Sequence, residues 1–381
     1  MQTKFIKNAN VVTENGIIFD GAVLISDNII KGVGKERDIE IPEDAEIIDA
    51  DGCYVGPGFV DIHVHGGNGY ATYEEPEKAG RFFLEHGTTT LFATPFYHMN
   101  LEELVEGIRV SREAIKNVPN IKGIYVEGPY INVKYGASAS KTPWRYSILE
   151  EEVKAMVDAG GEDVKVWTIA PEREGILTFT EYARKVNPSV KFAVGHSEAT
   201  PEEIRKLGKY RPAISTHIMN ATGRTGGGGG VRGYGPDEYC FAEGDMYAEL
   251  ISDSFGLHVN AELQRMILKI KGTDKVILIT DGTTTNNPNP PHLSYIEDLN
   301  FDENGELMGS KLTMDMACRN IMSHTDCGIC QAFKMASLNP AKAVGMGDEI
   351  GSIREGKIAD IIFVDDKFNV KKVILNGEVV K

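Results

Sequence analysis

The chain has 381 residues, of which 41% are hydrophobic and 25% charged, a composition typical of a globular protein. Its 56 acidic and 40 basic residues give a net charge of −16, which disfavours nucleic acid and anionic membranes as partners. No apolar run approaches the ~20 residues needed to span a bilayer, and residues 1–10 lack the apolar core of a signal peptide. The five cysteines form no disulfide framework, so we expect a cytoplasmic protein.

Both ends of the chain contain short β-type stretches separated by Asn, Gly and Asp turn signals. These stretches are residues 5–12, 16–19, 22–25 and 29–33 at one end, and residues 361–364, 370–375 and 378–380 at the other. Neither set is large enough to bury a stable core alone. We therefore predict that residues 1–56 and 347–381 pack together as one small β-sandwich domain.

Between these ends, strand-like runs alternate with amphipathic helix-like runs, which predicts parallel β/α architecture. The helix-like runs include residues 101–117, 149–159, 201–207 and 261–271. The eight strand candidates are residues 59–64, 89–93, 123–126, 164–169, 191–194, 213–215, 247–251 and 276–279. Their number favours a closed (β/α)8 barrel of the TIM type over residues 57–346.

Five consecutive glycines occupy positions 226–230 within the predicted barrel. The Lys-Ser/Thr pair of a phosphate-binding loop does not follow them, and no G-x-G-x-x-G motif follows a predicted strand. We interpret the glycine run as a mobile surface loop.

Side chains that bind metals or move protons follow five of the eight predicted strands. In a β/α barrel the strand ends converge on one face, where the chemistry takes place. His63 and His65 lie two positions apart on one strand, so both point the same way and can share a divalent cation. The other candidates are Glu127, His196, His217 and Asp281. Each alone has an ordinary structural explanation, but together they predict a metal centre.

Asp281 follows the eighth strand, where an isolated carboxylate could serve only as a helix cap. Beside a cation, it is placed to accept a proton from a water molecule whose pKa the cation lowers to near 7. His258 follows the seventh strand and is placed to reach a substrate group. The remaining histidines have no strand-end context, and we interpret them as structural or exposed: His86, His98, His292 and His324.

These residues resemble the N-acetylglucosamine-6-phosphate deacetylase family of the amidohydrolase superfamily. The resemblance covers nearly the full chain, and its most specific motif is Glu-Gly-Pro at positions 127–129. Further matching motifs lie at positions 57–66, 170–172, 195–197, 216–221, 256–259, 280–281 and 339–341.

The resemblance implies a role for each matching residue. Glu127, His196 and His217 would hold the principal metal ion, and Asp281 would be the general acid/base. His63 and His65 would complete a second metal position, which some family members lack. Asn220, Ala221 and His258 would contact the sugar phosphate, in a pocket that the family often completes across a homodimer interface.

The chain departs from the family pattern around the expected substrate. Ser138 stands where the family usually has a histidine, in the segment that begins at Lys134. Thr222 follows Ala221 where Met is usual, and the arginine that meets phosphate has no clean counterpart. Arg224, Arg232 and Lys134 are the candidate substrate-binding cations.

The leading hypothesis is metal-dependent hydrolysis of the N-acetyl amide of N-acetylglucosamine 6-phosphate, giving acetate and the free amine. One or two divalent ions are expected; nitrogen and oxygen ligands suit zinc first, and also iron, manganese or cobalt. The alternatives are the galactosamine epimer or another N-acyl small molecule, cyclic amide hydrolysis or deamination, and a non-catalytic barrel that serves as a binding module.

Overall fold

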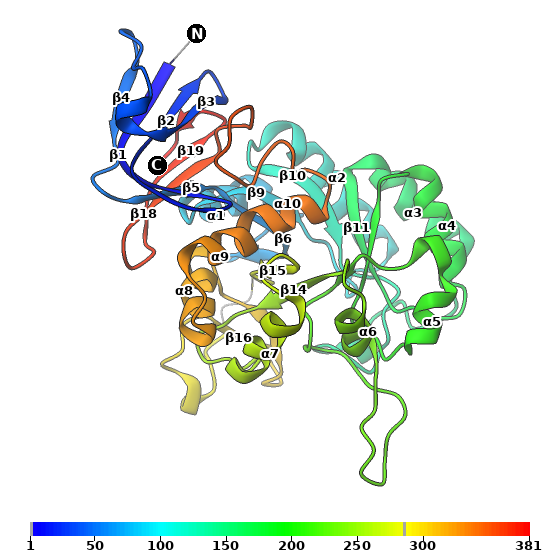
Figure 1. The fold of residues 1–381 in the computed structure, drawn as a ribbon. Helices are drawn as coiled ribbons and strands as arrows, with labels where there is room; N and C mark the ends of the chain where they lie inside the picture. Colours follow the sequence, from blue (N-terminus) through cyan, green and yellow to red (C-terminus); the bar gives the residue numbers. More distant parts are fainter. Residues whose placement is uncertain (1–2, 285–286) are drawn as a thin grey trace.

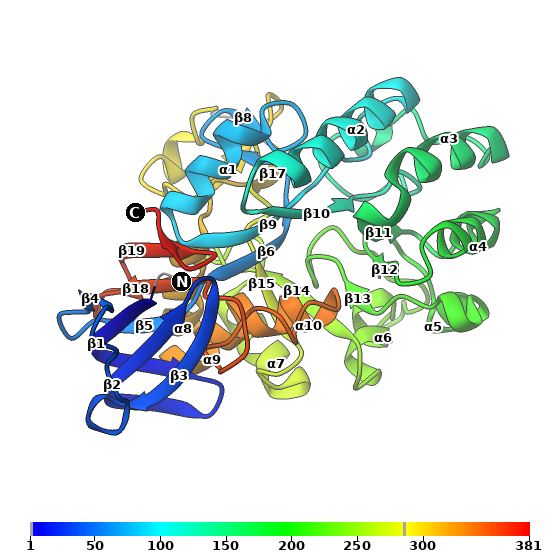
Figure 2. The same ribbon diagram turned by 90° about the horizontal axis from the view of Figure 1, so that it is seen from above.

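The computed structural model describes residues 3–284 and 287–381, and its central feature is an eight-stranded parallel sheet curled into a barrel (Figures 1 and 2). The strands neighbour one another in the order β15-β14-β13-β12-β11-β10-β9-β6. Their bounds are β6 Phe59–Val64, β9 Thr88–Ala93, β10 Ile121–Val126, β11 Val164–Ile169, β12 Lys191–Val194, β13 Ile214–Ser215, β14 Tyr247–Ile251 and β15 Val276–Ile279. The predicted TIM-type barrel is confirmed, and every strand lies within two residues of its predicted range.

Helices surround the barrel strands (Figure 2). They are α1 Pro76–Glu85, α2 Leu101–Asn117, α3 Glu150–Gly160, α4 Ile176–Val186, α5 Pro201–Lys206, α6 Pro236–Ala242, α7 Ala261–Lys271, α8 Met314–Thr325, α9 Ile329–Phe333 and α10 Asn339–Ala343. Local sequence sets their starts: Asn100 caps α2 and Thr200 caps α5, each in a capping box with a glutamate three residues later. None of the described helices is long and apolar enough to cross a membrane.

Strands from both ends of the chain form a second eight-stranded sheet in the order β20-β19-β18-β5-β1-β2-β3, with β4 paired to β1. Its strands are β1 Thr3–Thr13, β2 Gly16–Ser26, β3 Ile29–Lys35, β4 Glu46–Asp49, β5 Tyr54–Pro57, β18 Ile361–Val364, β19 Val370–Leu375 and β20 Glu378–Val379. The antiparallel pair β5–β18 joins the two ends of the chain. Ile6, Val23, Val55, Ile361 and Ile374 are among the fully buried side chains of its core. A β domain built from both termini therefore flanks the barrel (Figure 1).

One prediction in the terminal sheet is wrong. Residues 16–19 and 22–25 were predicted as separate strands, but both belong to β2. Asp20 adopts a left-handed φ of 49°, and the register with β1 shifts there, so the Asp-Gly pair makes a bulge and no turn. The Asp-Gly turn signal does not end the strand, because the residues on both sides of it pair with β1.

Two short hairpins lie outside the barrel sheet. Strands β7 Gly66–Gly67 and β8 Tyr70–Ala71 form one, and β16 Leu299–Phe301 and β17 Leu307–Ser310 form the other. The five-glycine run lies in a long arm that projects from the body of the protein (Figure 1), with bridges between Thr225 and Tyr234 and between Gly228 and Val231. All five glycines have positive φ, a conformation that residues with a Cβ rarely adopt.

Hydrogen bonds just beyond the ends of β6 and β15 bring the first and last barrel strands together. The Asp281 amide donates to the His63 carbonyl at 3.0 Å, and the His65 amide donates to the Gly282 carbonyl at 2.9 Å. Below them, the Thr280 hydroxyl donates to Asp61 at 2.5 Å. These contacts place Asp281 beside the two histidines of β6, although some 200 residues separate them in sequence.

Three stacked rings join the β domain to the barrel. Phe333 of α9 stacks on Phe59 of β6, with ring centroids 5.8 Å apart, and packs at a tilt against Phe368 of the β18–β19 connection, with centroids 5.2 Å apart. All three side chains are buried. A Cβ on Gly56 would lie 2.4 Å from the Phe333 ring, so the glycine is required for this close approach.

We expect Phe333→Ala to lower the free energy of unfolding by about 3–5 kcal/mol, because it empties a filled volume at this junction. Urea denaturation measures the effect. The exposed Phe19 provides the matched control, and Phe19→Ala should change stability by less than about 0.5 kcal/mol. Equal unfolding midpoints for the two variants would contradict the stabilising role of the ring stack.

Candidate metal centre

A cavity opens at the C-terminal ends of the barrel strands. Seven of the sequence-predicted site residues line it: His65, Glu127, His196, His217, Asn220, Ala221 and Asp281. His63 is fully buried beneath them. The strand ends therefore bring together both groups of predicted ligands and the predicted acid/base.

Glu127, His196 and His217 converge on one point. Glu127 Oε1 lies 2.7 Å from His196 Nε2 and 3.0 Å from His217 Nε2, and the two Nε2 atoms are 3.1 Å apart. All three side chains are almost completely buried. They come from the ends of β10, β12 and β13, which are close together in the barrel.

The outer nitrogens of these imidazoles fix which atoms face inward. His196 Nδ1 donates to the Tyr135 carbonyl at 3.2 Å, and His217 Nδ1 donates to the Asn220 carbonyl at 3.0 Å. A carbonyl oxygen can only accept, so in the neutral rings both Nε2 atoms are lone-pair acceptors. With both rings neutral, these two atoms and Glu127 Oε1 are three acceptors that face one another without a donor. A cation between them satisfies all three, and outer hydrogen bonds of this kind are typical of metal-ligating histidines.

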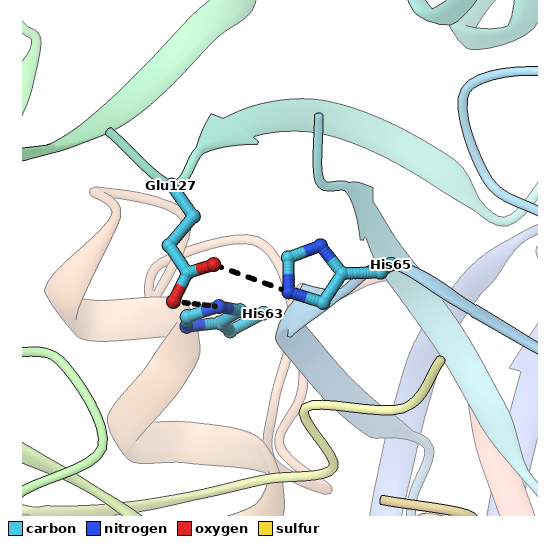
Figure 3. A group of neighbouring side chains, drawn as sticks. All are labelled: His63, His65 and Glu127. Carbon is cyan, nitrogen blue, oxygen red and sulfur yellow. Dashed lines mark ion pairs between the residues drawn. The ribbon is translucent and has the colours of Figure 1, made fainter. Parts of the chain in front are cut away.

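His63 and His65 form a second group around the same carboxylate. Their Nε2 atoms lie 3.6 Å from Glu127 Oε1 and 3.4 Å from Glu127 Oε2, respectively, and all three side chains point toward one another (Figure 3). His65 Nδ1 donates to the Thr94 carbonyl at 2.8 Å, which directs its Nε2 inward. His63 Nε2 is buried without a hydrogen-bond partner. The two oxygens of Glu127 thus lie between two candidate ligand groups.

Asp281 completes the cluster. Its Oδ1 lies 3.1 Å from His65 Nε2 and 3.8 Å from His63 Nε2. Burial raises the pKa of this carboxyl, but the hydrogen bond with His65 and the charges of both histidines outweigh burial and lower the pKa. The carboxylate therefore stays ionised and able to accept a proton.

The electrostatics of the cluster favour positive charge. Burial lowers the pKa of His65, but hydrogen bonds to Asp281 and Glu127 outweigh burial and raise the pKa to about 10. In His217, burial likewise opposes and Glu127 raises the pKa, to about 9. The pKa of Glu127 falls well below its ordinary value, because the neighbouring histidines outweigh burial. The same negative potential attracts a metal cation, so the residues present fit a divalent ion.

Backbone strain is concentrated in the same place. His196, His217, Ala221 and Asp281 all have positive φ values, between 28° and 50°, a region that residues with a Cβ rarely adopt. Such outliers cluster at functional sites, where the surrounding structure holds them in place. The strain is consistent with a site built to fix side-chain directions.

The other predicted substrate-binding residues do not line the cavity. Arg224 and Arg232 both pair with Glu238, at 3.0 and 3.3 Å, and Lys134 pairs with Glu198. His258 Nδ1 lies 3.0 Å from an Asp253 carboxylate oxygen and its Nε2 lies 3.1 Å from the Gly309 carbonyl oxygen, so both ring nitrogens have a local partner. In the described structure, each of these four side chains therefore interacts with another residue of its own chain.

Sequence reasoning missed several residues of the site. His98, interpreted as structural or exposed, lines the cavity and packs edge-on against Tyr97, with ring centroids 4.5 Å apart. Both lie in the loop after β9, and their place after a strand end was the available signal. The buried Glu249, in the middle of β14, contacts His63 and carried no such signal. The remaining wall is mostly apolar or hydroxylic: Tyr73, Phe96, Thr283, Thr284, Leu307 and Met308.

Comparison with known proteins agrees with this geometry. The chain is 28% identical to N-acetylglucosamine-6-phosphate deacetylase of Bacillus subtilis over 99% of its length and 97% of the relative. It is 24% identical to N-acetylgalactosamine-6-phosphate deacetylase of Escherichia coli O157:H7, over 99% of both chains. A Mycobacterium smegmatis N-acetyl-D-glucosamine-6-phosphate deacetylase variant, solved in complex with that sugar phosphate, superposes with a TM-score of 0.83 at 26% identity, over the full length of both chains.

The match to a family model extends over residues 54–380, from the last N-terminal strand of the β domain through the barrel to the C-terminal strands. It contains every candidate metal ligand and Asp281. The chain belongs to the amidohydrolase family.

Proposed function

We propose that the protein hydrolyses the N-acetyl amide of an amino sugar phosphate, N-acetylglucosamine 6-phosphate or its galactosamine epimer, to acetate and the free amine. The observation that carries the proposal is the convergence of Glu127, His196 and His217 on one point, with Asp281 in the same cavity. Relatives named for both epimers match the full chain, which supports this substrate class.

A divalent cation bound at this point would polarise the amide carbonyl and lower the pKa of a water molecule. Glu127, His196 and His217 would hold it, and His63 and His65 would hold a second ion. Asp281 would accept a proton from the attacking water and deliver it to the nitrogen of the leaving amine. Asn220 and Ala221, in the cavity wall, would contact the sugar.

The ion and the assembly are part of the proposal. Imidazole and carboxylate ligands suit zinc, which we expect, and they also suit iron, manganese or cobalt. In line with the family resemblance we expect a homodimer, and from the cysteine content we expect a cytoplasmic location. A dimer leaves a route by which Arg224, Arg232 or Lys134 of one subunit would serve the substrate site of the other, although none lines the cavity of its own chain.

A second candidate is the same reaction on an acetamido sugar without phosphate. Among the described residues, no lysine or arginine lines the cavity. A phosphate carries up to two negative charges and is usually bound by arginine, lysine or backbone amides. The apolar and hydroxylic wall suits a neutral sugar better.

Acetate release from matched sugars separates the two candidates. If phosphate is bound, kcat/KM for N-acetylglucosamine 6-phosphate should exceed that for N-acetylglucosamine at least about 100-fold, equivalent to about 2.7 kcal/mol. The galactosamine pair, assayed alongside, identifies the epimer. Equal values with and without phosphate would favour the second candidate, and no acetate from any of the four would overturn both.

Asp281→Asn should lower kcat about 100- to 10,000-fold while the metal content stays at the wild-type level, because the amide cannot relay a proton. Steady-state kinetics and elemental analysis of the same preparation measure both quantities. Near-wild-type kcat in the variant would show that another group carries the proton.

His196→Ala should release the principal ion, because it removes a ligand and its inward lone pair. Elemental analysis after dialysis should show at least one equivalent less metal than in the wild type, with acetate release lost in parallel. The exposed His292 provides the control, and His292→Ala should keep both. Retention of full metal content by His196→Ala would remove this residue from the ligand set.

A further inference from the structure

Glu249 is a completely buried carboxylate in β14, on the interior side of the barrel beneath His63. Its Oε2 accepts a hydrogen bond from His63 Nδ1 at 3.1 Å. Its other oxygen, Oε1, is buried and has no hydrogen-bond partner. A charged group with one oxygen unsatisfied is costly to bury, so a compensating positive charge is expected nearby.

The other neighbours of Glu249 supply no such charge. The Tyr125 hydroxyl and the His217 amide each lie 3.4 Å from Oε2, a long distance for a hydrogen bond. Tyr125 also shares its hydroxyl with Thr216 at 2.9 Å and Thr168 at 3.1 Å. In the described part of the chain, the ion pairs of Glu249 include no lysine or arginine, and its partner is His63.

Glu249 also distinguishes His63 from the other three imidazoles. The Nδ1 atoms of His65, His196 and His217 donate to backbone carbonyls, whereas that of His63 donates to a carboxylate. A carboxylate partner raises the basicity of the ring more than a carbonyl does and fixes its orientation. Tyr125 stacks on the His63 ring, with centroids 4.5 Å apart, and holds its plane. The buried, unpartnered Nε2 consequently points at Glu127 and Asp281.

The carboxylates of the cluster favour bound cations. Three carboxylates, Glu127, Asp281 and Glu249, lie among the four imidazoles. Glu249 adds its carboxylate on the His63 side of this cluster, where it faces the His63 ring and not the Glu127–His196–His217 group.

We infer that Glu249 is a positioning residue that retains a second divalent cation at His63 and His65. The inference rests on the proposed metal-dependent function and goes beyond it, because it assigns the occupancy of the second position to a residue that touches neither ion nor substrate. Glu249 acts through His63: it aims the Nε2 atom and supplies the negative charge that the second cation neutralises.

The test compares the wild type with Glu249→Gln, which keeps the shape of the side chain and removes its charge. Metal-stripped protein is titrated with Zn²⁺ and followed by calorimetry and elemental analysis. The wild type should bind two equivalents, and the variant should bind the second about 10- to 100-fold more weakly. Glu203→Gln, at the cap of α5 and remote from the cluster, is the matched control and should bind as the wild type does.

Two equivalents with unchanged affinity in Glu249→Gln, or a single equivalent in the wild type, would overturn the inference. If the variant does not fold, electron paramagnetic resonance of wild-type protein loaded with Mn²⁺ decides: a spin-coupled pair supports a second ion, and an isolated ion refutes it. Failure of the proposed function looks different, because a protein with two ions and no acetate release would leave this inference standing.

Discussion

Outward hydrogen bonds from the imidazoles are the interaction on which the site depends. Each ring of the cluster donates Nδ1–H to an oxygen of the surrounding protein, and this single contact turns its Nε2 lone pair toward Glu127. Without these contacts the rings could rotate, and the buried carboxylates would lose their partners. The orientation of the four rings is therefore set by groups around the cluster: backbone carbonyls of the strand-end loops and one glutamate of the barrel interior.

The barrel supplies those oxygens because its strands end together. Thr94 follows β9, Asn220 follows β13, and Tyr135 lies in the loop after β10, so three separate β/α connections support the imidazoles. The hydrogen bonds between the ends of β6 and β15 then add Asp281. Left-handed backbone at His196, His217 and Asp281 is tolerated since packing on all sides holds it.

Most of this could be predicted from sequence where the signal is local. The buried strands read as apolar runs, and the predicted site residues lie at or just after their ends: His63, His65, Glu127, His196, His217 and Asp281. Contacts between distant segments gave no such signal. Arg224 and Arg232 looked available because their pairing with Glu238 depends on the fold of the glycine arm. Glu249 was overlooked because it lies within a strand, where the facing partner, His63, cannot be read from its neighbours.

The β5–β18 pairing has a consequence for how the protein is made. β5 ends at Pro57, and its partner begins at Ile361, so the whole barrel is synthesised between the two. At about 5–20 residues per second, the ribosome needs roughly 15–60 seconds to deliver the missing strand. Throughout that interval β5 exposes an unpaired edge of the kind that templates aggregation. The nascent chain is thus most vulnerable before its last strands emerge, and the barrel has to fold beside an incomplete neighbour.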